Sequence, residues 1–354
     1  MKGYNVAIVG ATGLVGQECI KVLEQRKFPV KKISLLASDR SAGKKAFFNH
    51  SEVEIKETTP EAFEGVDIAF FAIDTGISKH FAPIAVQAGA VVIDKSNAFR
   101  SDPSVPLVVP EVNMDDVRWH KGIIASPNCS TIQMVVVLSP LHKANPIKRV
   151  VVDTYQSVSG TGSAAIEELT TQSKQVLNGQ GTAPHVYPHQ IAFNILPEID
   201  VFLDNGYSKE EWKMVEETRK IMHEADLPIS ATCARVPVYI GHSEAVNIEF
   251  SESMSVDEVR QILTQSPGIK VLDDPVISLY PQAWSAAGTD EVFVGRIRHD
   301  ASHPRGIVMW IVADNLRKGA ALNAIQIAEE MVKRDWLKPS AAVGAKNGQG
   351  GGMK

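Results

Sequence analysis

The chain has 354 residues, enough for two domains, and its formal net charge at pH 7 is −5. Without a dense basic tract, it is a poor candidate for binding nucleic acid or an anionic membrane. Cys19, Cys129 and Cys233 have no metal-like spacing, which argues against a metal site or a disulfide framework and for a reducing compartment, the cytoplasm. No apolar run is long enough to span a bilayer, and no signal peptide is visible.

The first third of the chain alternates short apolar runs with helical patterns. This alternation is typical of βαβ units and predicts a Rossmann-type, doubly wound parallel sheet. The elements expected here are strands at 4–10, 31–37, 66–73, 90–94, 107–112 and 122–126, and helices at 14–27 and 78–89.

After Lys148 the strands become longer, which indicates a second α+β domain built on a larger sheet. We expect a dinucleotide-binding domain at 1–128, a second domain at 129–315 and a disordered Gly-rich tail at 338–354. An amphipathic helix at 316–337 is expected to return to the first domain. The other predicted elements are strands at 149–160, 229–240, 245–250, 291–298 and 306–313, and helices at 163–178, 208–224 and 255–265.

A glycine motif, "GATGLVG", joins the first strand to the first helix. Gly10, Gly13 and Gly16 would allow a tight turn and let a diphosphate approach the helix N-terminus. The spacing is GxxGxxG, so the turn should be one residue longer than in GxGxxG. The alternative is a tight turn without a ligand.

The second strand ends at Ser38, followed by Asp39, Arg40 and Ser41. A hydroxyl and a guanidinium suit the 2′-phosphate of NADP, whereas an acid at this point usually holds the ribose of NAD. Asp39 keeps NAD open if its side chain turns inward, and an ordinary solvated loop is the remaining alternative.

Cys129 stands where an apolar helical run begins, between Asn128 and Ser130. A helix N-terminus favours the thiolate, which is the nucleophilic form. The alternative is a small buried core residue, which is what we expect of Cys19 and Cys233.

A proton carrier and a carboxylate-binding group are candidates in "ARVPVYIGHSE". His242 follows Arg235 by seven residues, past a strand. An arginine there can hold a carboxylate with two parallel hydrogen bonds.

The motifs "GATGLVG", "SNAFR", "SPNCSTIQ", "QSVSGTG", "EETRK" and "RVPVYIGHSE" occur in this order. Together they resemble the aspartate-β-semialdehyde dehydrogenase family in its bacterial form, over residues 4–337. The resemblance implies that Cys129 is the nucleophile with Asn128 beside it, and that Gln156 orients the acyl group. It also implies that Arg235 binds the substrate carboxylate and that His242 is the general acid/base.

The resemblance further implies that Glu217 pairs with the substrate ammonium, and that Lys220 and Arg100 bind phosphate. The alternative for Glu217 is a surface acid paired with Arg219 or Lys213.

The implied reaction is NADPH-dependent reductive dephosphorylation of L-aspartyl 4-phosphate to L-aspartate 4-semialdehyde through a cysteine thioester. It belongs to the synthesis of lysine, threonine, methionine and diaminopimelate. The implied partners are these small molecules, phosphate and a second copy of the chain, as a homodimer or paired dimers. The implied NADP-binding residues are Gly10, Thr12, Gly13, Leu14, Val15, Ser38, Arg40, Ser41, Ser159, Gly160, Gly162 and Asn315.

Three other readings remain open. N-acetyl-γ-glutamyl-phosphate reductases share the chemistry, but their nucleophile usually lies in "NPGCY", and their substrate has no ammonium for Glu217. Glyceraldehyde-3-phosphate dehydrogenases usually have "SCTTN". A dinucleotide-binding sensor without catalysis is the alternative from another class.

Overall fold

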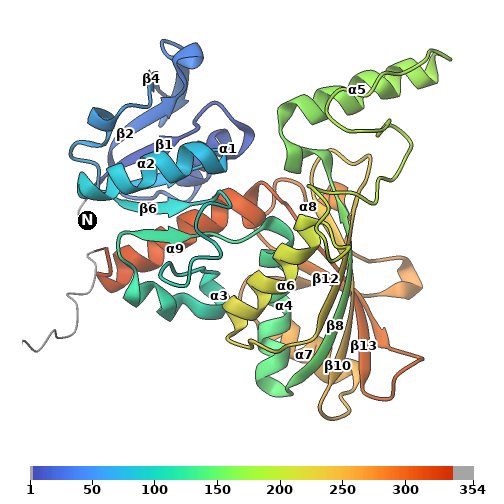
Figure 1. Ribbon diagram of the computed structural model, residues 1–354. Helices are drawn as coiled ribbons and strands as arrows, with labels where there is room; N and C mark the ends of the chain where they lie inside the picture. The colour runs from blue at the N-terminus through green and yellow to red at the C-terminus, as the bar shows by residue number, and fades with distance from the viewer. Residues whose placement is uncertain (1–2, 338–354) are drawn as a thin grey trace, which may run out of the picture.

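The computed structural model describes residues 3–337 and contains two sheets, each with its own helices (Figure 1). The predicted tail at 338–354 lies outside the described residues. The class predicted from the sequence, a parallel doubly wound sheet followed by a second α+β domain, is confirmed. Within residues 3–337, no helix combines the length and the apolarity needed to cross a bilayer.

The first sheet has the order β3-β4-β2-β1-β5-β6-β7, and only β3 runs antiparallel to its neighbour. Residues Val6–Val9 at its centre are fully buried, as expected of a parallel strand covered on both faces. Its elements are β1 (Tyr4–Val9), α1 (Leu14–Gln25), β2 (Val30–Ala37), β3 (Lys45–Phe48), β4 (Ser51–Glu57), β5 (Ile68–Phe71), α2 (Thr75–Gln87), β6 (Val91–Asp94), α3 (Pro110–Asn113) and β7 (Ile123–Ala125).

Two features of this domain differ from the prediction. The strand expected at 107–112 is wrong: Leu107 makes an isolated bridge to Ala125, and Pro110 then starts the short helix α3. Proline favours a first helical turn, where its missing N–H is not needed. The β3–β4 hairpin was not predicted, although Val53 and Ile55 alternate with charged residues in the manner of a half-exposed strand.

The second sheet has the order β11-β12-β13-β10-β8-β9 and mixes parallel with antiparallel pairs. One face is covered by helices, and part of the other is covered by the segment around α8. Its elements are α4 (Cys129–Ala144), β8 (Ile147–Gln156), α5 (Ser163–Leu177), α6 (Lys209–Met222), β9 (Ile229–Arg235), β10 (His242–Phe250), α7 (Val256–Gln265), β11 (Ile269–Val271), α8 (Ala283–Ala286), β12 (Val292–His299) and β13 (Gly306–Ala313).

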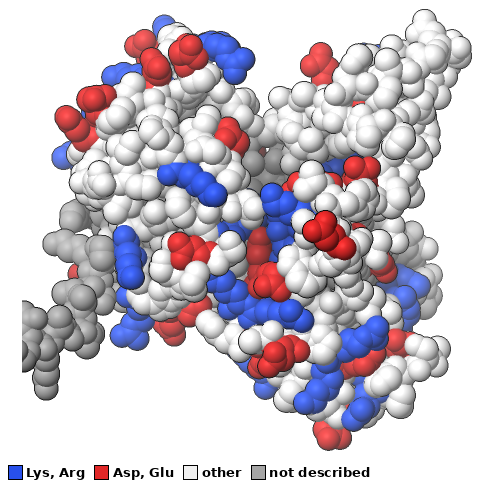
Figure 2. Space-filling view, in the orientation of Figure 1, with Lys and Arg blue, Asp and Glu red and all other residues white. Residues whose placement is uncertain are grey.

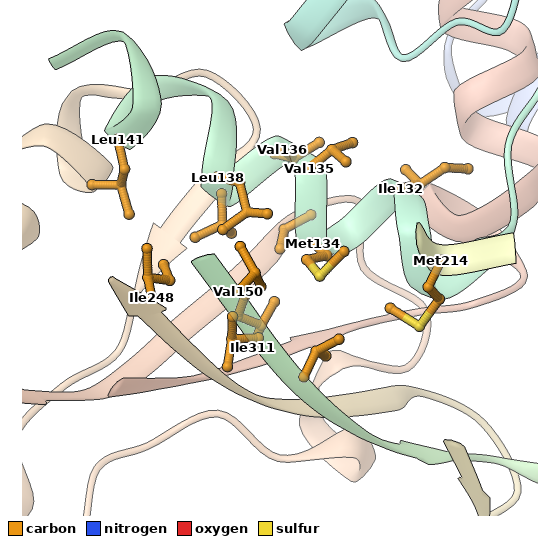
Figure 3. Packing of buried hydrophobic residues seen from close by; sticks show 14 of the residues in the cluster. Ile132, Met134, Val135, Val136, Leu138, Leu141, Val150, Met214, Ile248 and Ile311 are labelled. Carbon is orange, nitrogen blue, oxygen red and sulfur yellow. The ribbon is translucent and has the colours of Figure 1, made fainter. Parts of the chain in front are cut away.

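Helix α4 runs through the largest core of the protein. From Ser130 to Ser139 every residue is buried, as expected of a helix enclosed on all sides. Figure 3 shows Met134 and Leu138 of this helix beside Val150 of β8 and Ile311 of β13. Such packing fixes the helix against the sheet and thereby fixes the position of its first residue, Cys129.

The chain returns to the first domain at its end. A π-helical turn, Arg317–Ala321, precedes α9 (Leu322–Arg334), so the helix predicted at 316–337 is shorter and begins with a wider turn. Ile325 and Met331 of α9 are buried in one core with Ile8 of β1. We propose that the chain forms two domains: residues 1–128 together with the C-terminal helix form the first, and residues 129–315 form the second.

Candidate active site

Cys129 is the first residue of α4, as its sequence context predicted. The side-chain oxygen of Asn128 caps the helix by accepting from the N–H groups of Ser130 (2.9 Å) and Thr131 (3.3 Å). Gly319 of the π-turn lies against the cysteine, since a Cβ built at that glycine would be 2.8 Å from the Cys129 Cβ. The thiol is therefore held between a capped helix end and a close backbone contact.

Glu217 is buried and holds the residue before Cys129. Its Oε2 accepts from the backbone N–H of Asn128 (2.6 Å), and its Oε1 accepts from Nη1 of Arg100 (3.1 Å). The alternative of a surface acid paired with Arg219 or Lys213 is wrong, because the side chain is only 5% exposed and pairs with neither. Its carboxylate already has partners, so a substrate ammonium would have to share it with Arg100.

Lys220 lies one turn further along α6 and serves the same loop. Its ammonium donates to the carbonyl oxygens of Arg100 (2.9 Å), Asp102 (2.7 Å) and Val105 (2.9 Å). An ammonium has three hydrogens, so all three are engaged here. A phosphate could bind Lys220 only by displacing one of these carbonyl oxygens. As long as the three bonds are present, Lys220 fixes the backbone at Arg100.

Gln156 ends β8 and faces a second buried acid of α6. Its amide nitrogen donates to Glu210 Oε1 (3.2 Å) and to the Thr154 hydroxyl (3.3 Å). The same Glu210 oxygen accepts from the side-chain amide of Asn128 (2.7 Å). Gln156 and Asn128, predicted from different motifs, are thus brought together by a residue that the sequence analysis did not select.

Arg235 and His242 flank Gly160, at the end of β9 and the start of β10. A Cβ built at Gly160 would lie 3.0 Å from Arg235 Nη1 and 3.3 Å from His242 Nε2. Among the described residues, Arg235 Nε and His242 Nε2 are buried without hydrogen-bond partners. Buried donors without partners are rare, so these two nitrogens are the best candidates for contact with a substrate.

The protonation of His242 follows from its surroundings. The backbone N–H of Ser157 donates to Nδ1 (3.0 Å), so Nδ1 must be unprotonated and the neutral ring carries its hydrogen on Nε2. Burial and the nearby Arg235 lower the pKa of His242 to about 3. His242 is therefore a neutral N–H donor at physiological pH.

Asn315 connects the segments around His242. Its side-chain oxygen accepts from the Gly241 N–H (2.9 Å) and the Ser157 hydroxyl (3.0 Å), and its nitrogen donates to the Ser159 hydroxyl (2.9 Å).

Gly162 comes directly before α5. Its φ of 109° lies in the positive region that favours glycine.

The Cys129 thiol is subject to opposing influences. Burial raises its pKa and nearby Glu210 adds to this effect, whereas Lys95, Arg100 and Arg235 oppose it. The helix N-terminus, which favours the thiolate, therefore acts against the effect of burial. Lys95, which the sequence analysis missed, donates to the Pro127 carbonyl (3.0 Å), and burial with nearby Arg100 lowers its pKa to about 8.

The glycine turn has the close contacts that its sequence predicted. Gly10 has a φ of 86°, and the Gly13 N–H bonds to the Gly10 carbonyl (3.0 Å). A Cβ at Gly16 would lie 2.1 Å from that carbonyl, so only glycine lets α1 pack this close to the turn. Thr12 is half-buried in the turn, and Leu14 and Val15 form the first helical residues.

The loop after β2 engages one carboxylate oxygen of Asp39 in a local turn. Its Oδ1 accepts from the backbone N–H of Arg40 (2.8 Å) within a short 3₁₀ turn, Asp39–Ser41. Ser38 and Arg40 are exposed at this strand end, and Ser41 is half-buried. This arrangement leaves the Arg40 guanidinium available to an anion.

A pocket of about 360 Å³ opens beside Arg100, Glu217 and Lys220, with Asn97 and Lys213 also in its wall. Figure 2 shows side chains of both charges gathered along the recess between the two halves of the molecule.

The sequence contains one indication of Glu210, the buried acid that the sequence analysis did not select. Glu210 and Lys213 repeat the spacing of Glu217 and Lys220 seven residues earlier, which places them on the same helix face.

Comparison with known proteins agrees with this architecture. Residues 5–120 match the family model for the semialdehyde dehydrogenase NAD binding domain, and residues 138–318 match the semialdehyde dehydrogenase dimerisation domain. Fold and site thus define a two-domain semialdehyde dehydrogenase.

The similarity extends over nearly the whole chain. The aspartate-semialdehyde dehydrogenase of Aquifex aeolicus is 54% identical over 335 residues, covering 94% of this chain and 98% of its own. That of Bacillus subtilis is 49% identical, with the same coverage. The crystal structure of aspartate semialdehyde dehydrogenase II from Vibrio cholerae complexed with ASA is 47% identical, with a TM-score of 0.92 over 94% of this chain and 99% of that one. This chain belongs to the aspartate-semialdehyde dehydrogenase family.

Proposed function

We propose that this chain catalyses the NADPH-dependent reductive dephosphorylation of L-aspartyl 4-phosphate to L-aspartate 4-semialdehyde, in the aspartate pathway of lysine, threonine, methionine and diaminopimelate synthesis. One observation carries the proposal. Cys129 lies at a capped helix end, in a site where Arg235 and His242 flank Gly160 and where, among the described residues, Arg235 Nε and His242 Nε2 have no hydrogen-bond partner. A nucleophile, a carboxylate-binding cation and a neutral proton donor are what the reaction requires.

In the proposed reaction the sulfur of Cys129 bonds to the acyl carbon, and the bond from that carbon to the phosphate oxygen breaks. Phosphate leaves with the proton of the thiol and is bound by Arg100 and, after one carbonyl is displaced, by Lys220. Arg235, whose Nη1 donates to the Ser157 carbonyl (2.7 Å), holds the α-carboxylate through its Nε and Nη2. Glu217 receives the ammonium beside Arg100.

The later steps use His242 as a donor. Its Nε2 hydrogen faces the oxygen that gains charge when the acyl group on Cys129 is reduced, and stabilises that charge. Gln156 and Asn128 fix the orientation of the same group. Cleavage of the C–S bond then releases the semialdehyde, and the sulfur takes up a proton. The reverse direction requires a base at Nε2, which the neutral ring supplies only as its other tautomer, with the hydrogen on Nδ1.

The residues of the glycine turn fit a dinucleotide, because the backbone at Gly10 and Gly16 leaves no room for side chains and α1 begins beside it. The cofactor, when bound, supplies the hydride. We propose NADP rather than NAD, since Arg40 is free for a 2′-phosphate while Asp39 is tied to the backbone. The aspartate semialdehyde dehydrogenase of Candida albicans, which is 28% identical with a TM-score of 0.74 over 95% of this chain and all of that one, has a crystal structure with NADP.

We further propose a homodimer that buries the open face of the second sheet. A cavity of about 460 Å³ lies there, lined by Ala245, Tyr280 and Trp310. Nearby, Val276 and Trp284 are 93% and 88% exposed, which is unusual for large apolar side chains. Pairing of dimers into tetramers and a cytoplasmic location remain predictions from the sequence.

The test is a steady-state assay of NADPH formation from aspartate semialdehyde, with and without phosphate, and with NADP⁺ or NAD⁺. We expect turnover that requires phosphate and is more efficient with NADP⁺. Cofactor binding without turnover would show a sensor, and preference for the N-acetylglutamate semialdehyde would show the related reductase.

A further inference from the structure

Glu210 is a buried acid that contacts two proposed site residues at once. One of its oxygens, Oε1, accepts from the side-chain amides of both Asn128 (2.7 Å) and Gln156 (3.2 Å). Asn128 precedes α4 and Gln156 ends β8, so Glu210 on α6 joins two segments on either side of the nucleophile. The side chain of Glu210 is only 7% exposed.

The carboxylate is ionised in spite of its burial. Burial opposes the charge, but Lys213 and the amides of Asn128 and Gln156 together lower the pKa of Glu210 below its ordinary value. The Lys213 ammonium contacts Oε2 (3.2 Å) and also Asp200 (2.8 Å). A charged acceptor forms stronger hydrogen bonds than a neutral one, so both amides are held firmly.

The orientation of the Asn128 amide is fixed by its two partners, the N-terminus of α4 and Glu210. Its oxygen is used to cap α4, because it accepts from Ser130 and Thr131, and its nitrogen must therefore face Glu210. Glu217, seven residues later on the same face of α6, binds the backbone N–H of Asn128. Two carboxylates of one helix thus hold one residue, the first by its side chain and the second by its backbone.

We propose that Glu210 is a positioning residue of the reaction: through Asn128 and Gln156 it sets where an acyl group lies relative to the Cys129 sulfur. Among the described residues, the Glu210 carboxylate accepts hydrogen bonds from Asn128, Gln156 and Lys213 and not from the thiol. The inference rests on the proposed function, since it assigns Glu210 to the geometry of that same site.

The decisive variants are Glu210→Gln and Glu210→Ala. A glutamine keeps an acceptor oxygen but loses the charge and turns an amide donor toward Lys213. We expect kcat to fall about 10- to 100-fold, the usual effect of losing a charged hydrogen bond, and a larger fall for alanine. Binding of NADPH, measured by fluorescence titration, should stay within about twofold, because the glycine turn is untouched.

The matched control is Glu211→Gln, the next residue of α6. Glu211 forms a capping box with Ser208 and accepts from the Cys233 N–H. Its substitution should lower the unfolding temperature while leaving kcat close to that of the parent chain. If both variants lose kcat in proportion to their loss of unfolding temperature, the role of Glu210 is structural.

A double-mutant cycle separates positioning from general damage. If Glu210 acts through Gln156, then Glu210→Gln should cost at least threefold less in kcat when Gln156→Ala is already present. Equal costs in the two backgrounds, or full kcat in Glu210→Gln, would overturn the inference. Failure of the parent chain to turn over aspartate semialdehyde would instead overturn the proposed function, so the two failures are distinguishable.

Discussion

Glu244 offers a stability prediction that follows directly from its place in β10. The residue is fully buried, and neither carboxyl oxygen has a hydrogen-bond partner among the described residues. Burial raises the pKa of Glu244 well above its ordinary value. The nearby Gln133 side chain lowers this pKa slightly, but its amide donates to the His242 carbonyl (3.4 Å) and not to Glu244. Glu244 is therefore protonated in the folded protein.

The substitution Glu244→Gln replaces this acid by a neutral group of the same shape. In the unfolded chain Glu244 loses its proton above about pH 4.3, whereas the folded chain keeps it. The folded state then binds more protons, so its stability falls as pH rises, by about 1.4 kcal/mol per pH unit, until the folded pKa is reached. Glutamine has no such cost. Between pH 6 and pH 8 we expect the stability of the variant relative to the parent chain to increase by up to about 3 kcal/mol.

The assay is urea unfolding followed by circular dichroism at fixed protein concentration, at pH 6, 7 and 8. Glu216→Gln is the control, because Glu216 is an exposed acid of α6 paired only with Arg219 in this part of the chain. Its stability should differ from that of the parent by the same amount at each pH. Parallel pH dependence for Glu244→Gln and the parent chain would refute a protonated, buried Glu244.

Three further predictions concern activity. Iodoacetamide should modify Cys129 alone in the folded protein and inactivate it, because Cys129 is partly exposed whereas Cys19 and Cys233 are buried, and burial raises the pKa of Cys19 to about 12 and that of Cys233 well above its ordinary value; mass spectrometry of the labelled chain checks this, and Cys129→Ala should bind NADPH without turnover. Arg235→Lys should lower kcat/KM for aspartate semialdehyde about tenfold or more, since lysine lacks the planar fork; an unchanged kcat/KM would remove Arg235 from carboxylate binding. Arg40→Ala should weaken NADP binding more than NAD binding in parallel titrations, and equal losses would contradict a 2′-phosphate contact.

Strong periodicity made most elements of the fold predictable. The helices expected at 163–178, 208–224 and 255–265 lie within one or two residues of α5, α6 and α7. The strand expected at 107–112 failed because its apolar letters match a strand, while its proline starts a helical turn. The π-turn before α9 was not visible either, since its residues satisfy an ordinary helical pattern.

The site was predictable where a motif places chemistry at an element end, as with Cys129 at the start of α4. It was less so where a side chain acts through others. Glu210 reads in the sequence as one more helix acid, and only the meeting of α6 with two separate segments gives it partners. Likewise, nothing in the sequence indicates that Lys220 donates to three carbonyls, because these contacts depend on the path of a loop.

The return of the C-terminal helix to the first core has a consequence for synthesis on the ribosome. The first sheet is complete at Ala125, but its core also contains residues of Ala321–Met331. At roughly 5–20 residues per second, the intervening chain of about 200 residues takes about 10–40 s to make. During that time the apolar face later covered by α9 is exposed on the nascent chain. The first domain is therefore synthesised first, but its core is completed only when α9 has been made. A chaperone that binds apolar surface should be found on nascent chains stalled after Ala125 and before α9.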